Sequence, residues 1–212
     1  MIQINDLSLS IKGHPILSNV NMAMYEGNIY GLVGNNGSGK TMLMKCVCGF
    51  IKPTLGEVIV NGEVIGKDID YIKETGIIIE NPGFIMYYSG IKNLKMLSEI
   101  SGKVDITKIR KTMETCGLNP DLKLPVKKYS LGMKQRLGIA QAIMEDQSIL
   151  ILDEPMNGLD KDGIAVIRNL LLDMKKRGKL ILLASHNRED IDVLCDEVFD
   201  VEKGQVRQYR KN

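Results

Sequence analysis

The stretch "GLVGNNGSGKT" constrains the fold more than any other part of this 212-residue chain. It places Gly34, four further residues, then Gly39, Lys40 and Thr41 between the apolar run "IYGLVG" and a helical pattern at 41–50. Glycines tolerate backbone angles that other residues avoid, so successive N–H groups can point inward and bind phosphate oxygens. The helix that follows adds the positive end of its dipole. The stretch therefore predicts a phosphate-binding loop, with a ligand-free glycine turn as the alternative.

The residue types in this phosphate loop (residues 34–41) indicate a nucleoside triphosphate and a metal ion. A lysine at the end of such a loop reaches the β- and γ-phosphates, and the next hydroxyl binds Mg²⁺. We therefore expect ATP and Mg²⁺ as cofactors, with Lys40 also acting in catalysis and Thr41 as a metal ligand. The expected nucleotide contacts are Gly34, Asn35, Asn36, Gly37, Ser38, Gly39, Lys40, Thr41 and Met42.

Two acidic residues end a second apolar run, "SILILDEP". In a phosphate-loop enzyme, an aspartate at a strand end binds Mg²⁺, which predicts that role for Asp153. The next carboxylate can accept a proton from the attacking water, so Glu154 is the expected general base. An acid pair after a buried strand is by itself an ordinary exposed strand end, and the phosphate loop is what favours the functional interpretation.

A histidine follows a third apolar run, in "KLILLASHNRED". Ligands of α/β proteins bind at the carboxyl ends of parallel strands, so His186 lies where it could donate a hydrogen bond to the γ-phosphate. The alternative is a histidine on the surface without a ligand.

The three runs "IYGLVG", "SILILD" and "KLILLAS" are short and continuously apolar, as parallel strands buried on both faces are. Alternating stretches from Ile2 to Tyr30 indicate half-buried strands, and "GEVIVNGEVIG" predicts a hairpin with a turn at Asn61-Gly62. The prediction is an α/β fold: a P-loop NTPase (RecA-like) core with an antiparallel β subdomain.

Residues 90–118 carry two helical stripes, which predict an inserted α-helical subdomain. We expect a single domain over residues 1–212, in which 1–81 and 146–212 form the core and 82–145 form the helical lobe.

Composition limits the alternatives. A net charge of +2 provides no field for general binding to nucleic acid, and no nucleic-acid partner is expected. No apolar stretch approaches the length of a membrane span, and the first residues lack the pattern of a signal peptide, so a membrane role would require a partner. The four cysteines show no zinc-type spacing and are expected to be reduced core thiols of a cytoplasmic protein.

The ordered motifs "GNNGSGKT", "YSLGMKQR", "LILDEP", "NGLD" and "LLASH" resemble the ATP-binding subunits of ABC transporters over essentially the whole chain. That family carries a signature, "LSGGQ", which corresponds here to Tyr129, Ser130, Leu131, Gly132 and Met133. The combination of "IIIENPGF" with "YSLGMKQRLGIA" is similar to the branch associated with bacitracin and lantibiotic-type peptide export.

The resemblance implies a homodimer in which two copies sandwich two ATP molecules. Ser130 and Gly132 would then contact the phosphates held by the second copy, Asp160 would lie at the same nucleotide, and Lys134 and Arg136 would lie near these anions. From the residues alone, Ser130 is equally a simple helix N-cap.

The resemblance also implies that transmembrane permease subunits dock near Pro82–Leu97, where residues 84–88 form an apolar tip that we expect to be partly exposed. The protein would be cytoplasmic and peripheral on the inner face of the cell membrane.

The chain departs from the family pattern at several positions. Glu80 stands where the family has a glutamine that binds Mg²⁺, and the resemblance makes Glu80 a metal ligand. Ile11 aligns with an aromatic residue that stacks on adenine. Within the signature, Leu131 replaces a glycine and Met133 replaces a glutamine.

Two other functions were weighed. A nucleotide switch acting on ribosomes or DNA is the alternative, although such relatives carry two cassettes or a long coiled coil that this chain lacks. A nucleotide kinase would leave the signature unexplained and is rejected.

Overall fold

The computed structural model describes residues 1–80 and 83–209. Its larger sheet has six strands in the order β10-β9-β3-β8-β7-β6, and every neighbouring pair is parallel except β10 with β9. The strands are β3 (Ile29–Val33), β6 (Thr75–Ile78), β7 (Ile149–Asp153), β8 (Leu180–Ala184), β9 (Glu197–Glu202) and β10 (Gln205–Tyr209). The three apolar runs are β3, β7 and β8, side by side at the centre of the sheet, as their buried character predicts.

The smaller sheet is antiparallel, with the order β2-β1-β4-β5. Its strands are β1 (Ile2–Ile11), β2 (His14–Met24), β4 (Leu55–Val60) and β5 (Glu63–Val64). Val60 pairs with Glu63 across a turn in which Asn61 and Gly62 both have positive φ, so the predicted hairpin is confirmed.

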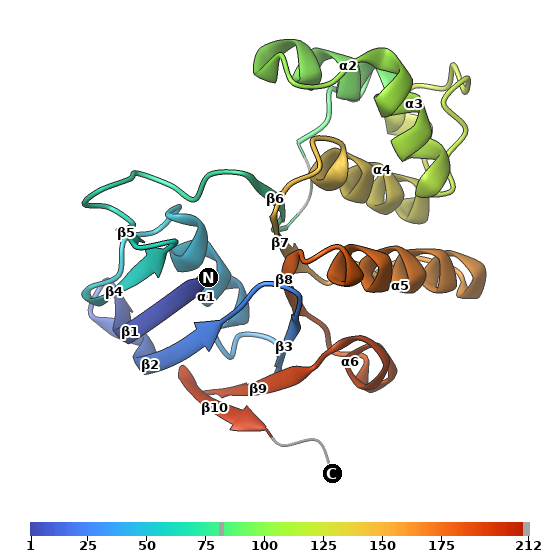
Figure 1. Cartoon of the computed structure of the whole chain (residues 1–212). Helices are drawn as coiled ribbons and strands as arrows, with labels where there is room; N and C mark the ends of the chain where they lie inside the picture. Colours follow the sequence, from blue (N-terminus) through green and yellow to red (C-terminus); the bar gives the residue numbers. More distant parts are fainter. Residues whose placement is uncertain (81–82, 210–212) are drawn as a thin grey trace.

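Six α-helices and one short 3₁₀ helix complete the described part of the chain. The helices are α1 (Lys40–Cys48), α2 (Gly90–Ser101), α3 (Ile106–Thr115), η1 (Val126–Lys128), α4 (Leu131–Ile143), α5 (Lys161–Lys176) and α6 (Arg188–Leu194). Figure 1 shows α2, α3 and α4 grouped on one side of the molecule and the antiparallel sheet on the other, with the parallel strands between them. This arrangement confirms the predicted fold class.

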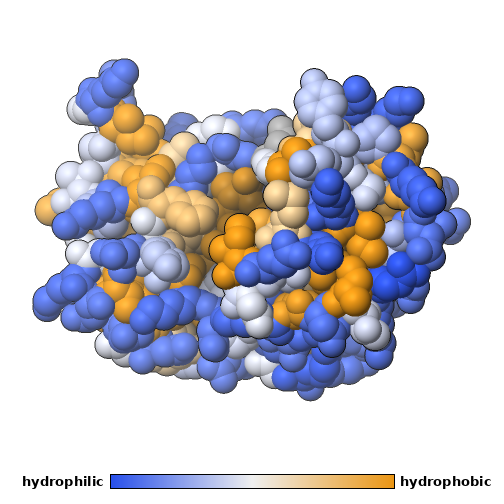
Figure 2. Space-filling model, turned by 90° about the horizontal axis from the view of Figure 1, so that it is seen from above, coloured by the Kyte–Doolittle hydropathy of each residue, from blue (hydrophilic) through white to orange (hydrophobic). Residues whose placement is uncertain are grey.

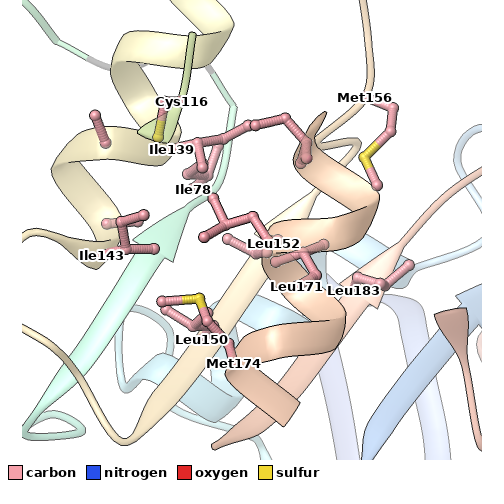
Figure 3. Close-up of a cluster of buried hydrophobic side chains, with 14 of the residues drawn as sticks. Ile78, Cys116, Ile139, Ile143, Leu150, Leu152, Met156, Leu171, Met174 and Leu183 are labelled. Carbon is pink, nitrogen blue, oxygen red and sulfur yellow. The ribbon is translucent and has the colours of Figure 1, made fainter. Parts of the chain in front are cut away.

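The core lies on both faces of the parallel sheet because its central strands are apolar on both sides. On one face, Leu150 and Leu152 of β7 pack with Ile139 of α4 and Leu171 of α5, as Figure 3 shows. The other face packs against α1 and the antiparallel sheet through a second buried cluster. Helices from the distant 131–143 and 161–176 segments therefore cover the same strands.

The four cysteines are buried, as expected for core residues. Burial raises the pKa of the Cys46 thiol to about 11 and those of Cys48 and Cys116 to about 12, because an apolar interior disfavours the thiolate.

Among the described residues, none of the helices has the length and apolar character needed to cross a bilayer. The predicted boundary between core and helical lobe falls at residues 81 and 82, which lie outside the described residues. The division into 1–81, 82–145 and 146–212 remains a prediction.

Gly76 in β6 provides a test of this packing. A Cβ added there would lie 1.9 Å from the carbonyl oxygen of Ala142 in α4, so a side chain forces strand and helix apart. We expect Gly76→Ala to lower the free energy of unfolding by about 2 kcal/mol in urea denaturation. Gly83→Ala is the control, because an added Cβ there meets no atom within 4 Å. Equal stability of the two variants would contradict the packing.

Candidate active site

The phosphate loop joins the end of β3 to the start of α1, and its glycines are required by its geometry. Gly34 and Gly39 have φ of 138° and 115°, in the region that favours glycine. A Cβ on Gly34 would lie 2.2 Å from the carbonyl oxygen of Val201, and one on Gly39 would lie 2.9 Å from the side chain of Leu17. The loop is thus packed against β9 and β2, with no room for larger residues at these two positions.

Lys40 lies inside this loop and is only 7% exposed. Its ammonium group donates to the carbonyl oxygens of Gly34, at 2.6 Å, and Asn35, at 3.1 Å. The hydroxyl of Ser38 is also buried and, within the described residues, is the one buried side-chain polar atom without a hydrogen-bond partner. A buried hydroxyl of this kind is costly unless a ligand satisfies it. The loop therefore has a donor available for an anion.

Thr41 and Asp153 bring α1 and β7 together at the carboxyl edge of the sheet. The hydroxyl of Thr41 donates to Oδ2 of Asp153 at 2.7 Å, across 112 residues of sequence. A hydroxyl and a carboxylate are the oxygen ligands that Mg²⁺ uses alongside water and substrate phosphates. These two residues fit the metal expected from the sequence.

Glu154 and His186 follow the neighbouring strands β7 and β8. Nδ1 of His186 lies 2.8 Å from Oε2 of Glu154, and the backbone N–H of Glu154 donates to the carbonyl oxygen of Ala184 at 3.0 Å. Glu154 has a φ of 50°, which a non-glycine residue adopts only where its surroundings hold it. The structure thus joins the expected base and the expected phosphate donor in one hydrogen-bonded pair.

These groups surround a cavity of about 670 Å³. Its lining includes nine of the predicted residues: Asn36, Gly37, Gly39, Lys40, Thr41, Met42, Glu80, Asp153 and Glu154. Asn36 also lines a second cavity of about 610 Å³, where Gly34, Asn35 and His186 lie, so the predicted residues flank the phosphate loop on two sides.

Glu80 lines the same cavity as Thr41 and Asp153 and forms an ion pair. Its carboxylate lies 2.5 Å from Nζ of Lys45, on the helix that follows the phosphate loop. The Glu80 side chain is 63% exposed, and its φ is 62°. Lys45 compensates the negative charge that Glu80 carries and that the glutamine of the family pattern would not. The role of Glu80 as a metal ligand stays a prediction.

Ile11 ends β1 and is 39% exposed, and it is not among the residues that line either cavity. Ile16 of β2 lines the larger cavity instead. The adenine contact expected of Ile11 stays a prediction, and Ile16 is an apolar candidate that the sequence did not single out.

Sequence reasoning also missed Gln135 and Asn157, which line the same cavity. Nε2 of Gln135 donates to the carbonyl oxygens of Glu154, at 3.2 Å, and Pro155, at 3.1 Å. Both residues lie within the motifs "YSLGMKQR" and "NGLD", so their positions in those motifs were the available signal.

Ser130, Gly132 and Asp160 do not line the phosphate-loop cavity. They line a separate cavity of about 370 Å³ at the start of α4 and α5. The hydroxyl of Ser130 accepts from the N–H of Met133 at 3.1 Å, which is the N-cap weighed from the sequence alone. Asp160 caps α5 by accepting from the N–H of Gly163 at 3.0 Å.

Arg136 lines the same cavity as Ser130 and Gly132, and the expectation that it lies near a bound anion stays a prediction. Its guanidinium donates to Oδ1 of Asp160 at 2.9 Å and to the carbonyl oxygen of Gly117 at 3.1 Å. Its cost at a helix N-terminus is therefore offset within the chain, through contacts that only the folded structure brings together.

Comparisons with known proteins agree with this geometry. Residues 17–157 match the family described as ABC transporter. An "Uncharacterized ABC transporter ATP-binding protein YybJ" of Bacillus subtilis is 43% identical, with all of this chain and 97% of the relative covered. The bacitracin transport ATP-binding protein BcrA of Enterococcus faecalis is 36% identical (97% and 68% covered), and the lantibiotic transport ATP-binding protein SrtF of Streptococcus pyogenes is 37% identical (97% and 89% covered).

Among solved structures, the dimeric bacterial ABC transporter cassette MJ0796 superposes with a TM-score of 0.89 and covers 99% of this chain and 98% of its own. At 20% identity it shows the fold. The chain belongs to the ABC transporter family, as one of its ATP-binding subunits and an ATPase. The expected similarity to the bacitracin and lantibiotic branch is also confirmed.

Asp160 gives a prediction with a defined pH dependence. The hydrogen bond from the Gly163 N–H, together with Arg136, lowers the pKa of the Asp160 carboxyl group, so folding favours its ionised form. The stabilisation is complete above the ordinary carboxyl pKa of about 4 and is lost as pH falls through the lowered value. Asp160→Asn should therefore melt below the parent protein at pH 7, with the difference closing below about pH 4. A difference independent of pH would contradict this assignment.

Proposed function

We propose that this chain binds ATP with Mg²⁺, hydrolyses it between two copies of itself, and so drives a membrane permease. The observation that carries the proposal is the convergence of Lys40, Thr41, Asp153, Glu154 and His186 at the carboxyl edge of one parallel sheet. Residues from three separate parts of the sequence meet there, in the place where α/β proteins bind nucleotides.

The phosphate loop would hold the β- and γ-phosphates. Lys40 exchanges its carbonyl partners for phosphate oxygens, and the unpartnered hydroxyl of Ser38 gains an acceptor. Thr41 and Asp153 would hold Mg²⁺, which neutralises charge on the phosphates when it is bound.

Hydrolysis requires a water activated on the far side of the γ-phosphorus from ADP. Glu154 accepts a proton from that water while the water oxygen bonds to the γ-phosphorus. The bond between the γ-phosphorus and the β–γ bridging oxygen breaks, giving ADP and phosphate. His186 donates from Nδ1 to the Glu154 carboxylate through the 2.8 Å contact, and it donates to the γ-phosphate from its second ring nitrogen as well only when both ring nitrogens carry a proton.

The separation of two sets of residues supports the proposed dimer. Ser130, Gly132 and Asp160 line a cavity different from the phosphate-loop cavity of the same chain, so they are available to a nucleotide held by a second copy. The solved MJ0796 cassette, which has the same fold, is described as dimeric, and this supports the arrangement.

A permease and a peptide cargo are supported by the relatives and by an exposed apolar surface. BcrA and SrtF are named as bacitracin and lantibiotic transport proteins. Ile85, Met86 and Tyr87 are 44%, 39% and 77% exposed. Figure 2 shows apolar side chains gathered around a hollow on one face of the molecule. The docking range begins at Pro82, which lies outside the described residues. We propose that the exposed side chains of Ile85, Met86 and Tyr87 contact a permease and so hold the chain at the inner face of the membrane. We further propose that export of a peptide antibiotic is the transport function.

Nothing in the described residues favours the alternative of a switch on ribosomes or DNA, and the relatives above are transport proteins. The exposed apolar side chains of Ile85, Met86 and Tyr87 fit the transport function better.

Glu154→Gln tests the proposed function. Removal of the base should lower turnover by about a hundredfold or more, while ATP and Mg²⁺ now accumulate a dimer that size-exclusion chromatography detects. Glu114→Gln is the control, because Glu114 is exposed on α3, and it should hydrolyse ATP normally. A monomer at saturating ATP in the Glu154→Gln variant would exclude the proposed ATP sandwich.

Glu80→Gln tests the role of the Lys45 ion pair. Loss of one negative charge should tighten ATP binding without Mg²⁺ by roughly two- to fivefold in calorimetry, and raise the Mg²⁺ concentration needed for half-maximal hydrolysis. Lys45→Met should change ATP affinity in the opposite direction, because Glu80 is then uncompensated. Changes of the same sign in both variants would show that the pair does not set the charge at this site.

A further inference from the structure

Residues 86–89 and residues 125–127, which are distant in sequence, run side by side just before α4. The N–H of Val126 donates to the carbonyl oxygen of Tyr88 at 2.8 Å, and that of Lys127 donates to the carbonyl oxygen of Met86 at 2.9 Å. A β-bridge joins Ser89 to Pro125. We name residues 84–89 the docking segment. It is thus bonded along its length to residues 125–127, just before α4.

Tyr129 adds a side-chain link at the end of this ribbon. Its ring is buried, with 5% exposure, and its hydroxyl accepts the N–H of Gly90 at 3.2 Å. Gly90 is the first residue of α2, and the side chain of Ser89 makes no capping bond there. Helix starts leave N–H groups without partners inside the helix, so the Tyr129 hydroxyl replaces the missing cap. A Cβ on Gly90 would lie 2.8 Å from this hydroxyl, which explains the glycine.

The same residue leads directly into the signature. Tyr129 ends η1 through its N–H to Val126 and immediately precedes Ser130, whose side chain begins α4. The Tyr129 hydroxyl therefore holds the start of α2 to the residue next to Ser130. Ser130 is the residue that would contact the nucleotide of the second copy. The family signature has leucine at this position, which fills space but has no hydroxyl.

The other end of the docking segment is anchored as firmly. Asn93 of α2 is 4% exposed, accepts the N–H of Ile85 at 2.7 Å and donates to the carbonyl oxygen of Ser89 at 3.0 Å. A displacement of the exposed side chains of Ile85 or Tyr87 is therefore carried to α2 by Asn93 and to the start of α4 by Tyr129. Figure 1 shows α2 and α4 in the same lobe, away from the antiparallel sheet.

We propose that Tyr129 is a positioning residue that couples the docking segment to Ser130 through its hydroxyl. The inference rests on the proposed function, in which closure of two copies brings Ser130 to a nucleotide. Coupling between two sites is reciprocal, so closure on ATP changes the protection of the docking segment just as a partner on that segment changes the placement of Ser130.

Hydrogen exchange tests this in a Glu154→Gln background, with and without ATP and Mg²⁺. In the Glu154→Gln protein without a further substitution, which is the parent here, ATP with Mg²⁺ should slow amide exchange in peptides covering residues 83–93. Tyr129→Phe removes the hydroxyl and keeps the ring. It should speed exchange of the Gly90 amide roughly fivefold without nucleotide, and reduce the nucleotide-dependent difference by roughly half or more, while the dimer still forms.

Tyr30→Phe is the matched control. Tyr30 is fully buried in β3, and its hydroxyl accepts the N–H of Tyr25 at 2.8 Å, away from the docking segment. This variant loses an equivalent hydrogen bond and should keep the full nucleotide-dependent difference at 83–93. Tyr129→Leu, which restores the family residue, is a second variant that lacks the hydroxyl and should behave like Tyr129→Phe.

The outcomes are distinct. A purely structural role for Tyr129 would speed exchange equally with and without nucleotide, leave the difference intact, and overturn the inference. Loss of the difference in Tyr30→Phe as well would overturn it too, since the effect would then follow any lost hydrogen bond. Failure of the parent itself to dimerise would instead remove the proposed function, and with it the basis of the coupling.

Discussion

The hydrogen bond between Thr41 and Asp153 is the contact on which the site depends. It joins the start of α1 to the end of β7 and so fixes the phosphate loop relative to the acidic strand end. Parallel strands bring their carboxyl ends to a common edge, and that edge gathers the remaining groups, with Glu154 following β7 and His186 following β8. Because β3, β7 and β8 are buried on both faces, this edge belongs to the packed core of the molecule, and the core fixes where its side chains start.

Helix α4 connects this edge to the second set of residues. Near its start, Gln135 donates to the backbone just after β7, and Arg136 pairs with the aspartate that caps α5. Ser130 lies at the tip of the same helix but in a different cavity. One helix therefore contacts the backbone of the chain's own catalytic strand while presenting its end outward. This division is consistent with the proposed arrangement, in which each copy would contribute one half of a site to the other.

Local patterns were enough to predict much of this structure. The phosphate loop, the Asn61-Gly62 hairpin and the three central strands depend on residue types that are close in sequence, and all were found where predicted. The resemblance to a family supplied Ser130 and Glu80 as candidates. Contacts between distant segments could not be predicted: Arg136 with Asp160, Lys45 with Glu80, and Ile16 rather than Ile11 at the cavity wall. Each of these depends on how a side chain reaches across the folded chain, which periodicity and spacing do not encode.

The position of Lys40 has a consequence for how a nucleotide is taken up. Its ammonium group donates to two backbone carbonyl oxygens of the same loop, and Gly34 and Gly39 are packed against β9 and β2. The phosphate loop is thus preorganised, because the carbonyl oxygens of Gly34 and Asn35 hold the Lys40 ammonium group in the position that phosphate oxygens would otherwise require. Under the proposed function, a triphosphate would exchange partners with the lysine and would not have to order a flexible segment, so little conformational entropy would be lost on binding. Departure of the product would allow the lysine to return to the same two carbonyl oxygens.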